Sequence, residues 1–368
     1  IGYFATGIAC GLKKDNQLDL SIVCSEDMAV AAGGFTQNTV KGHSLQLTMK
    51  NIKNGYANAL VINSGNANAC NGSEGYEDAC EIAETVAQMM DLEPEDILVG
   101  STGVIGKPLD MDKIRPGLDE LISNMNPEGG HEAALAIMTT DTFAKEISLQ
   151  TQINGKTVTI GGMAKGSGMI HPNMATLIGV ITTDANISKS VLQKVLSSCT
   201  EKTFNRTSVD GDTSVCDMVI SLANGMAENE KIDENSKAYD EFYQAYLHVC
   251  TELAKMIAKD GEGATKLLEV EVTGARTKEE AAVLSKSIIA SNLVKTAVYG
   301  SDANWGRILC AMGYAGVEFD PDKVDLFIES KGSRLQLVKD GVAAEYSEET
   351  ATRILSEKKV KAIADIKM

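Results

Sequence analysis

A threonine at the start of an apolar run is the residue best placed to do chemistry. Thr176 follows a loop of small residues from Gly166 to Ala175, and Leu177–Ile181 has the unbroken apolar character of a buried strand. One interpretation is structural, because threonine is β-branched and favours strands. The alternative is a nucleophile: attack of the Thr176 hydroxyl on the Ala175 carbonyl would turn that peptide bond into an ester, and hydrolysis would free the Thr176 amine. An α-amine has a pKa of about 7.7–8.0, so it could act as the base for its own hydroxyl.

The stretch AKGSGMIHPNMATLIGVI (164–181) resembles the self-processing segment of the ornithine acetyltransferase family, the glutamate N-acetyltransferases. Six further stretches resemble this family in the same order along nearly the whole chain. They are LVINSGNANACNG (60–72), GSTGVIGKPL (100–109), AIMTTDT (136–142), NRTSVDGDTSVCDM (205–218), KDGEGATK (259–266) and VYGSDANWGRILCAMGYAG (298–316). This collinear set is more specific than any single motif and favours the nucleophile at Thr176.

Acyl transfer also needs donors for the oxyanion of the tetrahedral intermediate. Thr102 and Gly103 follow a short apolar run, in a turn that can direct a backbone N–H and a hydroxyl at one point. By itself this is an ordinary turn at the end of a strand. The resemblance implies that the turn is the oxyanion hole.

Three further residues are substrate ligands by resemblance. Lys165 matches a ligand that would hold a carboxylate, although a loop lysine is usually only solvated. Thr139 matches another ligand, with Thr140 as its nearest rival. Glu262 lies between two glycines in DGEGATK, where a carboxylate could pair with the ammonium group of an amino acid. Without the resemblance, that stretch is a plain acidic loop.

Other site classes fail on their spacing. GSTGVIGKP approaches the phosphate-loop pattern, but Ser101 replaces its first glycine and Pro108 its closing hydroxyl residue, so a magnesium ligand is missing. The stretch 210–214 lacks the sixth-position glycine and twelfth-position glutamate of a calcium loop. The four histidines and eight cysteines have no metal-ligand spacing. We therefore expect neither a metal nor an organic cofactor.

Composition indicates a globular protein without a nucleic-acid or membrane partner. The chain has 368 residues, 43% of them hydrophobic, and a net charge of −17 that disfavours binding to nucleic acid or an anionic membrane. No apolar run approaches the roughly 20 residues that span a bilayer. A secretory signal is not recognisable, and most cysteines lie in apolar or small-residue stretches, which favours reduced, buried thiols and a cytoplasmic location.

Hydrophobic periodicity predicts helices and strands that mix without strict alternation, which favours the α+β class over a doubly wound sheet. Asn154-Gly155 is a strong hairpin signal between two of the strands. The expected strands cover 4–11, 18–25, 57–64, 97–101, 147–152, 156–161, 177–181, 213–224, 266–273, 323–329, 334–338 and 359–368. The expected helices cover 74–90, 111–124, 130–138, 188–200, 237–258, 277–291 and 348–355. The polar loops 63–68 and 301–307 receive no catalytic role; they line the pocket or a subunit contact.

The family fold implied by the resemblance is a layered α-β-β-α arrangement with the nucleophile on a central strand. Self-cleavage would give an α-chain of residues 1–175 and a β-chain of residues 176–368, and family members form heterotetramers of two α- and two β-chains. Family members also continue past the last residue here, with an Asn and a Thr that bind substrate. No position matches them, so we expect the C-terminus to be incomplete.

The sequence thus predicts a glutamate N-acetyltransferase that moves the acetyl group of N2-acetyl-L-ornithine to L-glutamate through an acetyl-Thr176 ester, with ping-pong kinetics. Acetyl-CoA is a further candidate donor. Two alternatives stay open: an N-terminal-nucleophile amidase or aminopeptidase that uses water as the acceptor, and a binding protein that has lost the chemistry.

Overall fold

The computed structural model describes residues 1–171 and 177–368, and these form two compact units. Unit 1 comprises Ile1–Asn205 and Asp212–Glu262, and unit 2 comprises Arg206–Gly211 and Gly263–Met368. This division of the folded chain is separate from the expected division at 175/176, which stays a prediction.

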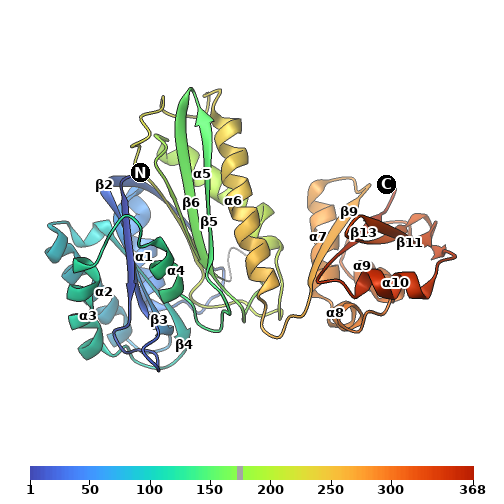
Figure 1. Cartoon of the computed structure of the whole chain (residues 1–368), viewed down its shortest axis with the longest axis horizontal. Coiled ribbons are helices and arrows are strands. Elements are labelled where there is room, and N and C mark those ends of the chain that lie inside the picture. Colours follow the sequence, from blue (N-terminus) through green and yellow to red (C-terminus); the bar gives the residue numbers. More distant parts are fainter. Residues whose placement is uncertain (172–176) are drawn as a thin grey trace. The chain divides into compact units, whose positions relative to one another are not determined.

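Unit 1 is built on one eight-stranded sheet (Figure 1). Its strand order is β4-β3-β2-β8-β7-β6-β5, with β1 paired to β2. The long strand β2 joins the two halves of the sheet, since Leu20–Cys24 pair with β3 and Val30–Phe35 pair with β8. The strands are β1 (Tyr3–Ile8), β2 (Leu20–Phe35), β3 (Tyr56–Asn66), β4 (Ile97–Val104), β5 (Lys145–Ile153), β6 (Lys156–Lys165), β7 (Ile178–Thr183) and β8 (Met218–Ala223).

The two halves of this sheet stack face to face. Gly100 of β4 lies against the side chain of Met218 of β8, so closely that a Cβ there would be 2.3 Å from the Met218 methyl carbon. Because β4 and β8 are not neighbours in the sheet, this contact crosses between layers. Leu60 of β3 and Val180 of β7 accordingly belong to one buried core.

Helices cover the outer faces of both halves (Figure 1). The opposite face of β3 packs in a second core with α2 and α3, while α6 packs on β5 and β6. This arrangement confirms the α+β class and the predicted α-β-β-α layering within unit 1. The helices of unit 1 are α1 (His43–Asn51), α2 (Glu74–Met90), α3 (Met111–Ser123), α4 (Gly130–Ala136), α5 (Lys189–Lys202) and α6 (Tyr239–Lys259).

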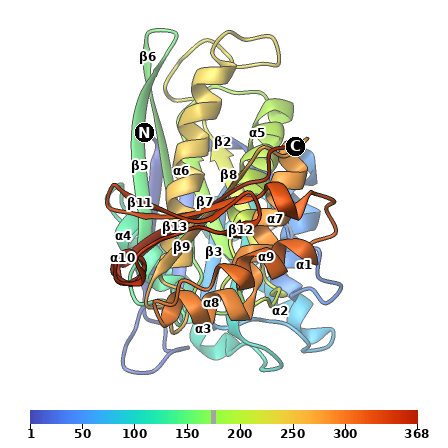
Figure 2. The ribbon, with the colours of Figure 1, turned by 90° about the vertical axis from the view of Figure 1, so that its right-hand side faces the viewer.

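Unit 2 has its own five-stranded sheet and its own core (Figure 2). The strand order is β12-β11-β10-β13-β9, with β9 parallel to β13 and the other pairs antiparallel. Its strands are β9 (Leu267–Thr273), β10 (Asp325–Ser330), β11 (Ser333–Lys339), β12 (Val342–Ala343) and β13 (Lys359–Asp365), and its helices are α7 (Lys278–Ala290), α8 (Asn292–Tyr299), α9 (Trp305–Gly313) and α10 (Glu348–Leu355). In the part of the chain that the structure describes, short 3-10 turns occupy Ile52–Asn54, Pro94–Asp96, Phe204–Arg206 and Pro321–Lys323.

Several elements follow from local sequence chemistry. Asn154 and Gly155 have φ values of 50° and 77°, the left-handed pair that joins β5 and β6 in a tight hairpin. The Thr277 hydroxyl accepts a hydrogen bond from the backbone N–H of Glu280 and so caps α7. The Ser347 hydroxyl caps α10 in the same way. Helices α1, α8 and α9 were not predicted.

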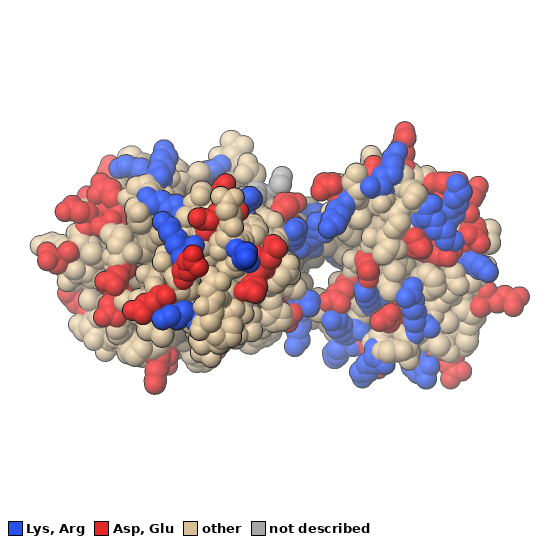
Figure 3. Space-filling model, turned by 90° about the horizontal axis from the view of Figure 1, so that it is seen from above, with Lys and Arg blue, Asp and Glu red and all other residues tan. Residues whose placement is uncertain are grey.

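Surface charge, thiol exposure and helix hydrophobicity add three findings. Acidic and basic side chains are interspersed over the face shown in Figure 3. All eight cysteines are free, but Cys70 and Cys310 are exposed, which corrects the expectation of buried thiols. Among the described residues, no single helix has the length and apolar composition to cross a membrane; α7 and α8 meet that test only jointly, as a pair bent by 61°.

Candidate active site

The site is centred on the ammonium group of Lys165, at the end of β6. Its Nζ donates a hydrogen bond to Thr139 Oγ1 at 2.7 Å and to Thr102 Oγ1 at 3.2 Å. These threonines come from the loop after α4 and from β4, so three segments that are distant in the sequence meet at one nitrogen. Lys165 is only 8% exposed, so its ammonium group lies in the protein interior.

A buried ion-pair cluster lies beside Lys165. Lys145 Nζ is 2.6 Å from Asp141 Oδ1 and 2.6 Å from Asp260 Oδ2, and the side chains of Lys145 and Asp141 are fully buried. Asp141 Oδ2 lies 4.0 Å from Lys165 Nζ and accepts the Thr139 N–H at 2.9 Å. The backbone N–H of Gly166 donates to Asp141 Oδ1 at 2.7 Å. Asp141 therefore fixes both Thr139 and the chain that leaves Lys165.

The electrostatics of this cluster work in opposing directions. Burial lowers the pKa of Lys165, and the Asp141 and Asp217 carboxylates oppose that effect. Burial alone would raise the pKa of Asp141, but the charges of Lys165 and Lys145 and the hydrogen bonds outweigh it, so the pKa of Asp141 is lowered. The carboxylate is thus held in its charged form next to the lysine.

Thr102 and Gly103 lie at the end of strand β4 and not in a turn, which corrects the expectation from sequence; the turn follows at Ile105 and Gly106. We call this end of β4 with the turn that follows it the Thr102–Gly103 turn, and a close approach of two backbones fixes it. Gly103 has a φ of 134°, in a region that side chains rarely allow, and a Cβ there would lie 2.4 Å from the Gly65 carbonyl carbon and 2.5 Å from the Asn66 nitrogen. β3 and β4 run parallel here, and their register shifts between Gly65 and Asn66. Only glycine fits this position, at the point where the Thr102 hydroxyl faces Lys165.

Glu262 is tied to the loop that follows Lys165. Its backbone N–H donates to the Ser167 carbonyl at 3.0 Å, and the Ser167 hydroxyl donates to the Asp260 carbonyl at 2.8 Å. The carboxylate lies directly over Gly168, where a Cβ would be 2.3 Å from Glu262 Oε2. Glu262 is exposed, so its charge remains accessible to a ligand.

The structure thus brings together four of the residues proposed from sequence, namely Thr102, Gly103, Thr139 and Lys165, and places Glu262 on the adjoining loop. Thr139 is half-buried and bonded to Lys165, whereas its rival Thr140 is exposed. Ala175 and Thr176 lie outside the described residues. Among those that are described, no group of three or more His, Cys, Asp or Glu side chains is placed to hold a metal ion.

Sequence reasoning missed Asp141, Lys145 and Asp260, although Asp141 and Asp260 stand in the AIMTTDT and KDGEGATK stretches. It also missed Lys13, whose Nζ donates to the Met138 carbonyl at 2.6 Å and to the Leu18 carbonyl at 2.8 Å. Burial lowers the pKa of Lys13 to about 8. The available signal was an acidic residue two positions from Thr139 and from Glu262, whereas no local signal marked Lys145 or Lys13.

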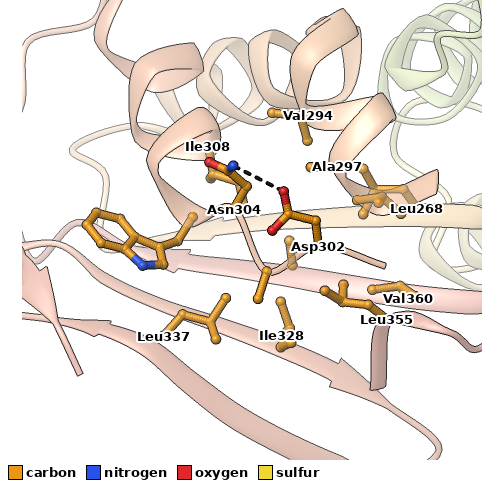
Figure 4. A pocket seen from close by; sticks show the side chains of 14 residues that line it. Leu268, Val294, Ala297, Asp302, Asn304, Ile308, Ile328, Leu337, Leu355 and Val360 are labelled. Carbon is orange, nitrogen blue, oxygen red and sulfur yellow. Dashed lines mark hydrogen bonds between the residues drawn. The ribbon is translucent and has the colours of Figure 1, made fainter. Parts of the chain in front are cut away.

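The stretch 301–307 lies in unit 2, where it lines a mostly apolar cavity (Figure 4). Trp305 and Asn304 belong to this lining, and Asn304 Nδ2 donates to Asp302 Oδ2 at 3.2 Å. The remaining lining comes from core side chains such as Leu268, Ile328 and Val360. Nothing in this lining resembles the charged cluster around Lys165.

Comparisons with known proteins identify the family to which the chain belongs. The model of the ArgJ family matches residues 4–368. The arginine biosynthesis bifunctional protein ArgJ of Caldanaerobacter subterraneus subsp. tengcongensis is 47% identical over 366 residues, which cover 100% of this chain and 91% of that protein. ArgJ 1 of Clostridium acetobutylicum is 48% identical over 356 residues, covering 96% and 87%. The crystal structure of ornithine acetyltransferase complexed with ornithine from Mycobacterium tuberculosis is 37% identical, with a TM-score of 0.43, and covers 48% of this chain and 92% of that one.

These matches make the protein an enzyme of the acyltransferase class. More closely, the chain belongs to the ArgJ family, which is the ornithine acetyltransferase family that its motifs resemble. The assignment rests on the family model and on the two full-length relatives.

Proposed function

We propose that this enzyme is a glutamate N-acetyltransferase of arginine biosynthesis, which transfers acetyl from N2-acetyl-L-ornithine to L-glutamate. The observation that carries the proposal is the meeting of Lys165, Thr102 and Thr139 at one buried ammonium, in a chain of the ArgJ family. Relatives of this chain bear the name arginine biosynthesis bifunctional protein. A second activity, with acetyl-CoA as the acetyl donor, is part of the proposal.

The nucleophile is made by self-cleavage. The Thr176 hydroxyl adds to the Ala175 carbonyl, the C–N bond breaks, and the acyl group moves from nitrogen to oxygen. Water then hydrolyses this ester and leaves the Ala175 carboxylate and the free Thr176 amine. The products are an α-chain of residues 1–175 and a β-chain of residues 176–368.

Catalysis proceeds in two half-reactions. The Thr176 amine takes the hydroxyl proton while the oxygen attacks the acetyl carbonyl of acetylornithine, and Thr102 and Gly103 donate to the oxyanion. The C–N bond then breaks, the proton passes to the departing amine, and ornithine leaves an acetyl ester on Thr176. The amine of glutamate attacks this ester, which yields N-acetylglutamate and regenerates the hydroxyl. This chemistry calls for neither a metal nor an organic cofactor.

Substrate binding uses the charges next to the turn. Lys165 holds the substrate carboxylate, Thr139 supports it, and the exposed Glu262 pairs with an ammonium group. We further propose that the α- and β-chains remain associated, as a heterotetramer of two each, and that the enzyme works in the cytoplasm.

The first test is the intact mass of the purified protein under denaturing conditions. Two chains that divide between Ala175 and Thr176 would support self-cleavage, and a Thr176→Ala variant should remain one chain without activity. A Thr176→Ala variant with full activity would refute Thr176 as the nucleophile. A wild-type chain that never divides and has no activity would favour a binding role.

The second test concerns the acceptor. Acetylornithine should be consumed much faster with glutamate than without it, and double-reciprocal plots should be parallel. Equal consumption without glutamate would indicate an amidase or aminopeptidase that uses water. Intersecting plots would contradict the ping-pong order.

A further inference from the structure

The asparagine-rich segment 63–71 forms a buried polar network next to the Thr102–Gly103 turn. Asn63, Asn66 and Asn68 are only 1%, 3% and 0% exposed. Buried amides that find all their partners hold a single geometry, because breaking any one contact leaves an unsatisfied polar group.

One arm of the network holds the residue before the turn. The Ser101 hydroxyl donates to Asn63 Oδ1 at 2.6 Å and lies 2.7 Å from Ser44 Oγ. Asn68 Nδ2 in turn donates to Ser44 Oγ at 3.1 Å. Thr102 therefore follows a residue whose side chain is fixed from two directions.

The other arm holds the residues after the turn. Asn66 Nδ2 donates to the carbonyls of both Lys107 and Pro108 at 2.8 Å. The Ala67 N–H donates to the Val104 carbonyl at 2.9 Å. The loop that leaves Gly103 is thus fastened to the same segment.

We propose that Asn63 and Asn66 are positioning residues for acyl transfer, which set the place of the Thr102 hydroxyl and the Gly103 N–H. The inference rests on the proposed function, since that function assigns the oxyanion to this turn. A donor of this kind acts only at the distance where charge develops in the transition state. Its displacement should therefore slow the chemical step and leave substrate binding unchanged.

The test compares two identical substitutions on one strand. Asn66→Asp removes the two donated bonds and sets a negative charge beside the Lys107 and Pro108 carbonyls. The matched control is Asn58→Asp, because Asn58 also lies on β3, is 5% exposed and donates from Nδ2 to one backbone carbonyl, that of Ser25 at 2.7 Å. Asn58 lies near the beginning of β3, whereas the residues next to the Thr102–Gly103 turn lie at its end.

For Asn66→Asp we expect kcat to fall about 10- to 100-fold per cleaved enzyme, with KM for acetylornithine within about twofold of wild type. Asn58→Asp should keep kcat within about twofold even if it lowers the melting temperature equally. Amide hydrogen exchange gives a readout that does not depend on activity. Exchange of residues 98–109 should become faster in Asn66→Asp and stay at the wild-type rate in Asn58→Asp.

Thr102→Val separates the two proposals. If Thr102→Val loses activity while Asn66→Asp keeps it, or if both Asp variants lose kcat equally, the positioning role is overturned and the proposed function stands. If Thr102→Val is fully active, the oxyanion assignment falls, and this inference with it. Should Asn66→Asp fail to fold or to mature, Ser101→Ala, which removes only the hydroxyl bonded to Asn63, is judged by the same criteria.

Discussion

The buried lysine between two aspartates makes a strong prediction about stability. Lys145→Met removes the ammonium that lies 2.6 Å from both Asp141 and Asp260, while it keeps most of the side-chain volume. Loss of one partner from a buried ion pair costs about 3–5 kcal/mol, because the remaining charge stays uncompensated. Although Lys145 pairs with two carboxylates, we do not expect twice this cost, because Asp141 keeps Lys165 at 4.0 Å and the hydrogen bond from the Gly166 N–H. For a unit of this size, the melting temperature should fall by about 6–20 °C.

Thermal unfolding followed by far-UV circular dichroism measures this effect, with peptide-level hydrogen exchange to locate it. The single tryptophan, Trp305, lies in unit 2, so its fluorescence reports on the other unit. Lys231→Met is the matched control, because Lys231 is exposed and such substitutions usually change stability by less than about 0.5 kcal/mol. The double variant Lys145→Met/Asp260→Asn removes one charge of each sign and should recover part of the loss.

The loss should also depend on pH with a defined sign. Without Lys145, the Asp141 carboxylate loses a favourable charge, so its pKa in the folded state rises relative to wild type. A folded state that binds protons more readily than the unfolded state gains stability as the pH falls. The deficit of Lys145→Met should therefore shrink toward acid. A variant as stable as Lys231→Met, or a deficit that grows on acidification, would refute this account of the cluster.

Three other expectations concern the site. Thr139→Val should raise KM about 10-fold or more through loss of a charge-assisted hydrogen bond, whereas steady-state kinetics of Thr140→Val should match wild type; equal effects would contradict the choice between them. Gly103→Ala should be much less stable in thermal unfolding than Gly106→Ala, because a Cβ collides with backbone at the first glycine and meets no atom within 4 Å at the second, although both have positive φ; similar melting temperatures would argue against the close approach. Because the folded-state pKa of Asp141 is lowered, its charge stabilises the fold fully above the ordinary value of 3.8, and this contribution is lost as the pH falls through the lowered pKa. Urea unfolding between about pH 2 and 4 should therefore depend less on pH in Asp141→Asn than in wild type; identical slopes would count against the shift.

Much of the fold could be predicted from local patterns. The periodic segment 74–90 and the segment 348–355 form α2 and α10 with the predicted bounds, and the Asn154-Gly155 signal gives the hairpin of β5 and β6. Helix α9 escaped prediction because Gly306 and Gly313 are weak helix formers. Its stability comes from packing, since Ala311 and Met312 are buried in the core of unit 2.

Residues of the candidate site could be named from the sequence, but the network that holds them could not. Family motifs indicated Thr102, Thr139, Lys165 and Glu262 without their supports. The ion pair of Lys145 with Asp260 joins residues 115 positions apart, and its value depends on burial that only the folded chain creates. Local patterns carry no information about such pairing.

The sheet of unit 1 has a consequence for the enzyme after self-cleavage. The proposed break lies between β6 and β7, which pair in antiparallel register from Ile160 with Thr183 to Lys165 with Ile178, while β7 also pairs with β8. Strand β8 in turn pairs with β2. The β-chain would thus contribute two inner strands, flanked on both sides by strands of the α-chain. The two polypeptides would then share one hydrogen-bonded sheet, and neither could dissociate without breaking the strand pairs β6–β7 and β2–β8. Maturation would be irreversible in a mechanical sense. Once separated, the α- and β-chains would have to rebuild two six-residue registers, that of β6 with β7 and that of β2 with β8, without the covalent link that first brought those strands together.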